Sequence, residues 1–294
     1  SQDTVDEVIE YAKLGGFGTI VIYHRSLFNS HGSYTLNREF WKEDTALKPA
    51  SDKIHAAGLR LGVHNLNLVI SKHDSLVTPV PAAGLMSYAS RQRLLARDIG
   101  PTDKFIPTTT SPRGLLAKGD KSIYHGRTLQ IEDELILYDA LQTEEPFGFS
   151  ATSDQDTYDG SHGNYRGCIR GAFGTQAAAH PAGSKIENLL EFVSGYYRPD
   201  VTSHLFDRVI QNMASFLDRF EFDYLYPDGM GQNIGYQAEG PGWYIRSLVP
   251  HKLYHSTRRE VRTIWGTWHT SSMGGEITDA VTSGVMATFN QSVR

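Results

Sequence analysis

A carboxylate ends an apolar stretch in the last third of the chain. Residues 222–226 read Phe-Asp-Tyr-Leu-Tyr, which is typical of a buried strand, and Pro227, Asp228 and Gly229 follow directly. A carboxylate at a strand end is placed for nucleophilic or acid–base chemistry, and a neighbouring glycine lets a ligand approach the backbone. Pro-Asp-Gly is also a strong turn signal, so catalysis and an ordinary turn both fit Asp228.

Two earlier apolar runs also end in polar or aromatic residues. These residues are Tyr23, His24 and Arg25 after the first run, and His64 and Asn65 after the second. Because the carboxyl ends of parallel strands meet at one edge, we expect them to form one site with Asp228. His24, His64 and Tyr226 are of types that transfer protons. Arg25 could bind a carboxylate or sulfate group of a substrate through two hydrogen bonds. Tyr23 and Asn65 are further candidates for substrate contacts. A structural role is the alternative for each of the three.

Aromatic residues gather near the end of the chain. Trp265, Trp268 and His269 lie at the end of a fourth apolar run, and Trp243 precedes that run. Aromatic faces suit the C–H groups of sugar rings, so we expect a substrate platform here, with core packing as the alternative. Glu276 lies in a glycine-rich stretch and is a candidate general acid.

Helical patterns alternate with the apolar runs. Apolar residues recur at helical spacing in 3–14, 45–57 and 205–220, and each of these segments precedes a strand-like run. This order predicts an α/β fold with parallel strands covered by helices, as in a (β/α) TIM-type barrel or a doubly wound sheet. Only about four or five core strands stand out, whereas a closed barrel has eight. Either further strands lie in irregular parts, or the chain is part of a longer protein.

The middle of the chain lacks this alternation of helical patterns and apolar runs. Residues 128–138 are β-prone and residues 165–175 are rich in glycine. We therefore expect a first part of the barrel in 1–110, a β-rich inserted subdomain in 111–195 and a second part of the barrel in 196–294.

Composition narrows the range of partners. The formal net charge is −5, and no long basic run is present, which argues against nucleic acid and anionic membrane surfaces. No apolar stretch approaches the roughly 18 residues that span a bilayer. A single cysteine, Cys168, excludes a disulfide within the chain. Asp154, Asp156 and Asp159 could bind a structural Ca²⁺, but a solvated acidic loop fits their spacing better, so we expect no cofactor.

Two stretches resemble a known family. The segments ALKPASDKIHAAGLRLGVH (46–64) and FDYLYPDG (222–229) resemble barrel segments of retaining α-glycosidases, the group that contains the α-galactosidases. The resemblance implies a (β/α)₈ barrel and places Asp228 at the position of the nucleophile. Tyr226 departs from the family pattern, which has lysine there. The segment IEDELILYD (131–139) together with RGAFGTQAAAHPAG (170–183) resembles small β modules of extracellular carbohydrate and phage-tail proteins, and we expect an extracellular or periplasmic location.

Three functions fit these residues. The first is a glycoside hydrolase acting on an oligosaccharide or polysaccharide, in which Asp228 attacks the anomeric carbon and Glu276 or Glu239 protonates the leaving oxygen. The two carboxyl groups must then lie about 5 Å apart. The second is a lyase or dehydratase acting on acidic, uronic-acid-containing glycans, with a His or Tyr base. The third is a non-catalytic carbohydrate-binding barrel.

Overall fold

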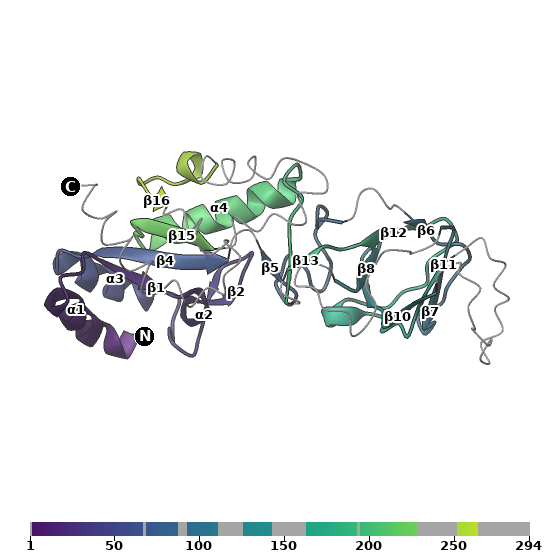
Figure 1. The fold of residues 1–294 in the computed structure, drawn as a ribbon, viewed down its shortest axis with the longest axis horizontal. Coiled ribbons are helices and arrows are strands. Elements are labelled where there is room, and N and C mark those ends of the chain that lie inside the picture. The colour runs from purple at the N-terminus through teal and green to yellow at the C-terminus, as the bar shows by residue number, and fades with distance from the viewer. Residues whose placement is uncertain are drawn as a thin grey trace. The chain divides into compact units, whose positions relative to one another are not determined.

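The computed structural model describes seven stretches of the chain: residues 2–66, 69–87, 93–110, 126–142, 163–192, 195–228 and 252–263. They belong to two compact units (Figure 1). Unit 1 combines residues 1–68 with 207–294, and unit 2 consists of residues 69–206.

Unit 1 is built on a parallel sheet. Its strands lie in the order β1 (Thr19–Ile22), β4 (Arg60–Leu66), β15 (Tyr224–Asp228) and β16 (Arg262–Thr263), and every pairing is parallel. In Figure 1, β4 lies between β1 and β15, which confirms the expected α/β class with parallel strands. The described residues contribute four strands to this sheet, so the closed barrel stays a prediction.

Helices precede three of these strands. The helical elements of unit 1 are η1 (Gln2–Thr4), α1 (Val5–Leu14), α2 (His24–Leu27), α3 (Leu47–Ala56), most of α4 (His204–Arg219) and a helical turn at 252–256. The apolar stripe predicted for α4 is buried throughout: Leu205, Phe206, Val209, Ile210, Met213, Phe216, Leu217 and Phe220. Burial of one helix face is what apolar residues at 3.6-residue spacing produce. A short antiparallel hairpin, β2 (Phe28–Ser30) with β3 (Thr35–Leu36), follows α2.

Unit 2 contains three small antiparallel sheets. The first is β10 (Ala140–Gln142), β11 (Gly163–Arg166) and β7 (Phe105–Thr108); the second is β6 (Arg93–Leu94), β12 (Lys185–Asn188), β8 (Thr128–Ile131) and β9 (Glu134–Leu137). The third is β13 (Glu191–Phe192), β14 (Tyr196–Tyr197) and β5 (Ile70–Ser71), and the short helix η3 (Ala172–Gly174) lies between β11 and β12. Aliphatic and tyrosine side chains from these segments, including Ile106, Leu129, Ile136 and Tyr165, form one buried cluster.

The β-rich unit is larger than the predicted insertion 111–195. It begins at residue 69 because β5, β6 and β7 pair with β14, β12 and β11 and therefore belong to it. The two parts of unit 1 are correspondingly shorter than 1–110 and 196–294. The β-prone segment 128–138 is also a hairpin of β8 and β9, with Glu132 at a φ of 52° in the turn.

Candidate functional site

Three aromatic rings lie side by side near the carboxyl ends of the first three strands of the unit 1 sheet. Ile22 pairs with Val63, so Tyr23 comes next to His64, and Tyr226 pairs with His64 from the other side. The His64 ring is 4.7 Å from the Tyr23 ring and 5.1 Å from the Tyr226 ring, between centroids. The sequence prediction that these strand ends share one edge therefore agrees with the register of the sheet.

His24 completes this group through a direct hydrogen bond. It is the first residue of α2, it is buried, and its Nδ1 lies 2.9 Å from Nδ1 of His64. The two imidazole rings are nearly parallel, with centroids 5.0 Å apart and planes at 24°. We call Tyr23, His24, His64 and Tyr226 the histidine–tyrosine row.

His31 adjoins the row and was missed in the sequence analysis. It is buried after β2, and its ring meets the ring of His24 edge-on at 5.2 Å between centroids. The rings of Phe28 and Tyr34 also contact it. In the sequence His31 stands in the polar stretch Asn-Ser-His-Gly-Ser, which reads as a loop, and only the fold brings it beneath His24.

Within the row Tyr23 is exposed, His64 and Tyr226 are half-buried, and His24 is buried. Tyr23 is 50% exposed, and Val21, two residues earlier on the same face of the chain, is 47% exposed. Gly62 keeps this face flat, because a Cβ there would lie 3.1 Å from Val21 Cγ2 and 3.3 Å from Tyr224 Cβ. The two exposed side chains, Val21 and Tyr23, therefore lie along one face of the sheet, beside Gly62 and His64.

Asp228 ends β15 just beyond the row. Its Cα pairs with that of Leu66, two positions after the pairing of Tyr226 with His64. Residues two apart in a strand occupy the same face, so position 228 is on the face that Tyr226 occupies. The structure describes the backbone of this residue. That backbone lies at the carboxyl edge of the sheet, where the nucleophile was predicted.

The remaining predicted site residues lie elsewhere. Arg25 is exposed on α2, and its carbonyl accepts a hydrogen bond of 2.9 Å from Asn37 Nδ2. Asn65 is buried, and because it follows His64 in the same strand it is on the opposite face. Among the described residues none donates to its Oδ1. The other candidates lie outside the described residues: Trp243, Trp265, Trp268, His269, Glu276 and Glu239.

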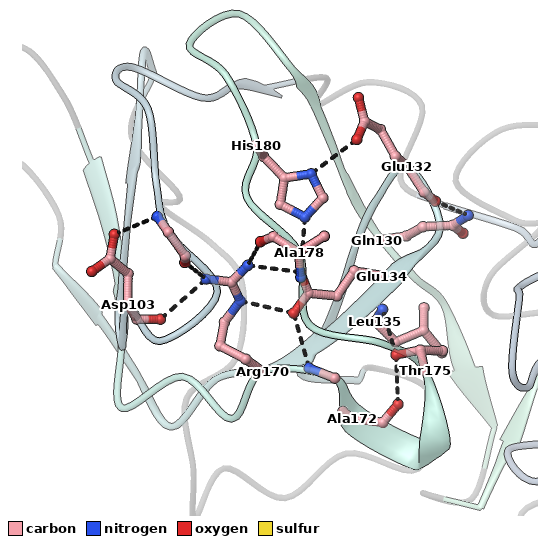
Figure 2. A network of polar contacts seen from close by, with 12 residues as sticks. Asp103, Gln130, Glu132, Glu134, Leu135, Arg170, Ala172, Thr175, Ala178 and His180 are labelled. Carbon is pink, nitrogen blue, oxygen red and sulfur yellow. Dashed lines mark hydrogen bonds and ion pairs between the residues drawn. The ribbon is translucent and has the colours of Figure 1, made fainter.

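A second polar cluster is buried in unit 2 (Figure 2). The Glu134 carboxylate accepts hydrogen bonds from Arg170 Nε at 2.8 Å and Nη2 at 2.7 Å, and from His180 Nε2 at 2.8 Å. Backbone N–H groups of Gly171 and Ala178 donate to the same carboxylate at 2.9 and 3.1 Å. We call Glu132, Glu134, Arg170 and His180 the Glu134 cluster.

The charges of this cluster are matched within the protein. Burial alone would raise the pKa of the Glu134 carboxyl, but the hydrogen bonds from Arg170, Gly171 and His180 outweigh burial and hold that pKa below its ordinary value. Nδ1 of His180 lies 3.0 Å from Glu132 Oε2. Arg170 also donates to backbone carbonyls of Gly100 and Ala178, so the cluster ties separate segments of unit 2 together. We interpret it as structural.

A second buried ion pair in unit 2 joins Lys72 to Glu191. The Lys72 ammonium lies 4.7 Å from the ring centroid of Phe173 and 5.2 Å from that of Tyr197, which adds cation–π attraction. Burial lowers the pKa of Lys72, and the Glu191 carboxylate partly opposes that shift. This pair, too, has its charges matched by protein groups.

Two further findings concern metal-ligand groups and long apolar helices in the part of the chain that the structure describes. No group of three His, Cys, Asp or Glu side chains there could hold a metal ion. The acidic segment with Asp154, Asp156 and Asp159 lies outside it. None of its helices combines the length and the apolar character that crossing a membrane requires.

Comparison with known proteins finds solved structures of low similarity, among them two glycosidases. No protein-family model matches the sequence, and no curated protein matches it either. A candidate α-N-acetylgalactosaminidase from Bacillus halodurans is 11% identical with a TM-score of 0.45, and the match covers 95% of this chain and 48% of that one. A GH27 β-L-arabinopyranosidase variant from Geobacillus stearothermophilus, in complex with arabinose, is 9% identical with a TM-score of 0.43, covering 92% and 46%. Both solved structures are described as glycosidases, and this chain spans about half the length of each.

Proposed function

We propose that this chain carries the active site of a glycoside hydrolase at the carboxyl edge of the unit 1 sheet. The observation that carries the proposal is the alignment of Tyr23, His64 and Tyr226 across three parallel strands, with Asp228 ending the third strand just beyond them. In parallel α/β folds this edge is where catalytic groups gather. The resemblance of 222–229 to the fourth barrel strand of retaining α-glycosidases supports the same assignment.

In the proposed reaction Asp228 is the nucleophile. Its carboxylate forms a bond to the anomeric carbon while the bond from that carbon to the leaving oxygen breaks, and water later hydrolyses the glycosyl ester. A second carboxyl group, about 5 Å away, gives its proton to the leaving oxygen and afterwards activates the water. Glu276 and Glu239 are our candidates for that group.

The row supplies the binding surface in this proposal. The half-exposed ring of Tyr23 offers an aromatic face for the C–H side of a sugar. His64 and Tyr226 bear polar atoms of the kind that bind sugar hydroxyls. The substrate would be an oligosaccharide or polysaccharide, and the four strands would be part of a (β/α)₈ barrel in an extracellular or periplasmic enzyme.

The test compares two aspartates that flank β15. We expect Asp228→Asn to lower kcat/KM by about 10³-fold or more on 4-nitrophenyl glycosides of neutral and acidic sugars, because the amide cannot attack the anomeric carbon. Asp223 is the matched control at the opposite end, where it accepts hydrogen bonds from the Leu61 N–H at 2.9 Å and meets His55 Nε2 at 2.8 Å. Asp223→Asn should keep the parent kcat/KM. Equal hydrolysis by both variants would remove Asp228 from the mechanism.

The histidine and tyrosine side chains of the row favour a second function, that of a lyase or dehydratase. His64 lies between two tyrosines and bonds to His24, and a His or Tyr base is what elimination from a uronic acid requires. In that reaction the base takes the proton α to the carboxylate, a carbon–carbon double bond forms, and the protonated leaving group departs from the next carbon. The product then absorbs in the near ultraviolet, whereas hydrolysis gives reducing sugar without that absorbance.

A non-catalytic barrel is the remaining outcome of these assays. It predicts glycan binding that survives Asp228→Asn, together with no turnover by the parent protein on any glycan of the panel. Hydrolysis by the parent protein would exclude it.

A further inference from the structure

We propose that His24 is a positioning residue that fixes the tautomer and the ring orientation of His64. The inference concerns the same site and, for its catalytic consequence, rests on the proposed function. It starts from the contact of 2.9 Å between the two Nδ1 atoms. A hydrogen bond between them requires that one Nδ1 carries a proton and that the other offers a lone pair.

This requirement sets the two rings in opposite tautomers. A neutral imidazole has one N–H, so the ring that donates from Nδ1 has a bare Nε2, and the ring that accepts at Nδ1 carries its proton on Nε2. Both rings in the same neutral tautomer would leave the short contact with no proton or with two. The geometry therefore couples the protonation site of His64 to that of His24.

His24 is suited to hold its partner still. Its side chain is 1% exposed, and its ring meets Tyr23 at 4.3 Å and His31 at 5.2 Å between centroids. Close packing in a buried position restricts the rotation of His24 about its own side-chain bonds. His64, by contrast, is half-buried in the sheet, beside the exposed Tyr23.

The consequence for the site lies in which nitrogen of His64 meets a ligand. Because Nδ1 bonds to His24, Nε2 is the nitrogen through which His64 would contact a substrate hydroxyl. A fixed tautomer makes that contact either a donor or an acceptor, whereas a free imidazole interconverts between the two. A positioning residue raises the reactivity of an active site by holding a donor or an acceptor in place before the substrate binds.

The test reads the tautomers directly by ¹H–¹⁵N correlation spectroscopy of the histidine rings, in EDTA-treated protein. We expect His24 and His64 to show one tautomer each, opposite to one another. His24→Phe should turn His64 into a mixture of tautomers. His24→Asn should restore the hydrogen bond to Nδ1 of His64, because the Asn amide can reach the place of the lost Nδ1, and the tautomer populations of His64 should shift away from those in His24→Phe.

Two further variants keep the test decisive. His55→Phe is the matched control, since His55 bonds to Asp223 at the other end of the strand, and it should leave the His64 signals unchanged. If His24→Phe does not fold, His64→Phe gives the reciprocal measurement, in which His24 loses its single tautomer. The proposal is overturned if both rings of the parent protein show the same tautomer, or if the remaining ring is unaffected in the Phe variant that folds.

Hydrolysis assays separate this proposal from the proposed function. His24→Phe should lower kcat by about 10- to 100-fold with little change in KM, as expected when a group that orients a functional side chain is lost, and His24→Asn should recover most of it. Undiminished hydrolysis by Asp228→Asn would defeat the glycosidase mechanism while the tautomer result stands. Matching tautomers would defeat the His24 proposal whatever Asp228 does.

Discussion

The histidine–tyrosine row of unit 1 and the Glu134 cluster of unit 2 use similar side chains in opposite ways. In the Glu134 cluster one buried carboxylate accepts five hydrogen bonds from protein donors, and both nitrogens of His180 face carboxylates. In the row, His64 bonds to another histidine and stands beside a tyrosine that is 50% exposed.

We interpret the Glu134 cluster as polar groups that hold the fold and, on the proposed function, the row as polar groups that meet a ligand. A buried charge is tolerated when protein groups match it completely, and such a cluster then orders the chain around it. Histidines and tyrosines at the exposed carboxyl edge of a parallel sheet face the place where ligands bind in such folds. The predictions below test this contrast.

The largest effect should come from breaking the buried cluster. Arg170→Met leaves the Glu134 carboxylate without its bidentate partner, and we expect a loss of about 3–5 kcal/mol in the free energy of unfolding. All four tryptophans, at 41, 243, 265 and 268, belong to the residue ranges of unit 1, so the measurement for unit 2 has to be another one. Hydrogen exchange of peptides from 163–192 should show the loss in unit 2. Unchanged protection of those peptides would contradict a structural role.

Acid should weaken the same cluster in the parent protein. The pKa of Glu134 is lowered on folding from its ordinary value of 4.5, so the contribution of this carboxylate is complete above that pH and declines as pH falls toward the folded pKa. Exchange protection of 163–192 should decrease over that acid range. Glu134→Gln should be less stable at neutral pH and should lose less stability on acidification. Equal acid sensitivity in both proteins would argue against this origin.

In the row the effect on stability should be small and the effect on activity larger. Tyr226→Phe keeps the ring beside His64 and removes only a hydroxyl, so we expect a change of less than about 1 kcal/mol in unfolding free energy. One lost hydrogen bond to substrate corresponds to about a tenfold lower kcat/KM. Denaturation followed by tryptophan fluorescence and glycoside assays measure the two. A loss of several kcal/mol would assign the row a structural role.

The smallest effect should come from an exposed ion pair, which serves as the comparison for the buried Glu134 cluster. Lys185 and Glu187 form an ion pair of 2.7 Å in unit 2, with side chains 48% and 31% exposed. Glu187→Gln should change the free energy of unfolding by no more than about 0.5 kcal/mol, since water screens such pairs. A loss as large as that of Arg170→Met would mean that burial does not explain the difference.

The elements of unit 1 could be predicted from local patterns. The apolar runs before His24, His64 and Asp228 are the strands β1, β4 and β15, and the helical stripe of α4 is buried as its spacing indicates. Adjacent residues of a strand point to opposite faces, which is why Asn65 does not join His64 in the row. The chemical roles of the row remain predictions.

The boundary of unit 2 could not be found in the same way. Strands β5 and β6 are only two residues long and carry no apolar run, and β6 pairs with β12 some 90 positions later. Pairings between distant short strands leave no periodic signal in the sequence. His31 was missed for a related reason, because its burial depends on contacts with His24 that come from the fold.

The register of β4 and β15 has a consequence for the order in which the chain folds. Leu66 pairs with Asp228, 162 residues later, whereas all the strand pairings of unit 2 lie within residues 69–206. Contacts between distant segments form slowly, because a long loop must close first. During synthesis the sheets of unit 2 can form before β15 leaves the ribosome. Strand β4 cannot pair with β15 until then. The histidine–tyrosine row can therefore be completed only after β15 has been made, because Tyr226 of that strand pairs with His64 of β4.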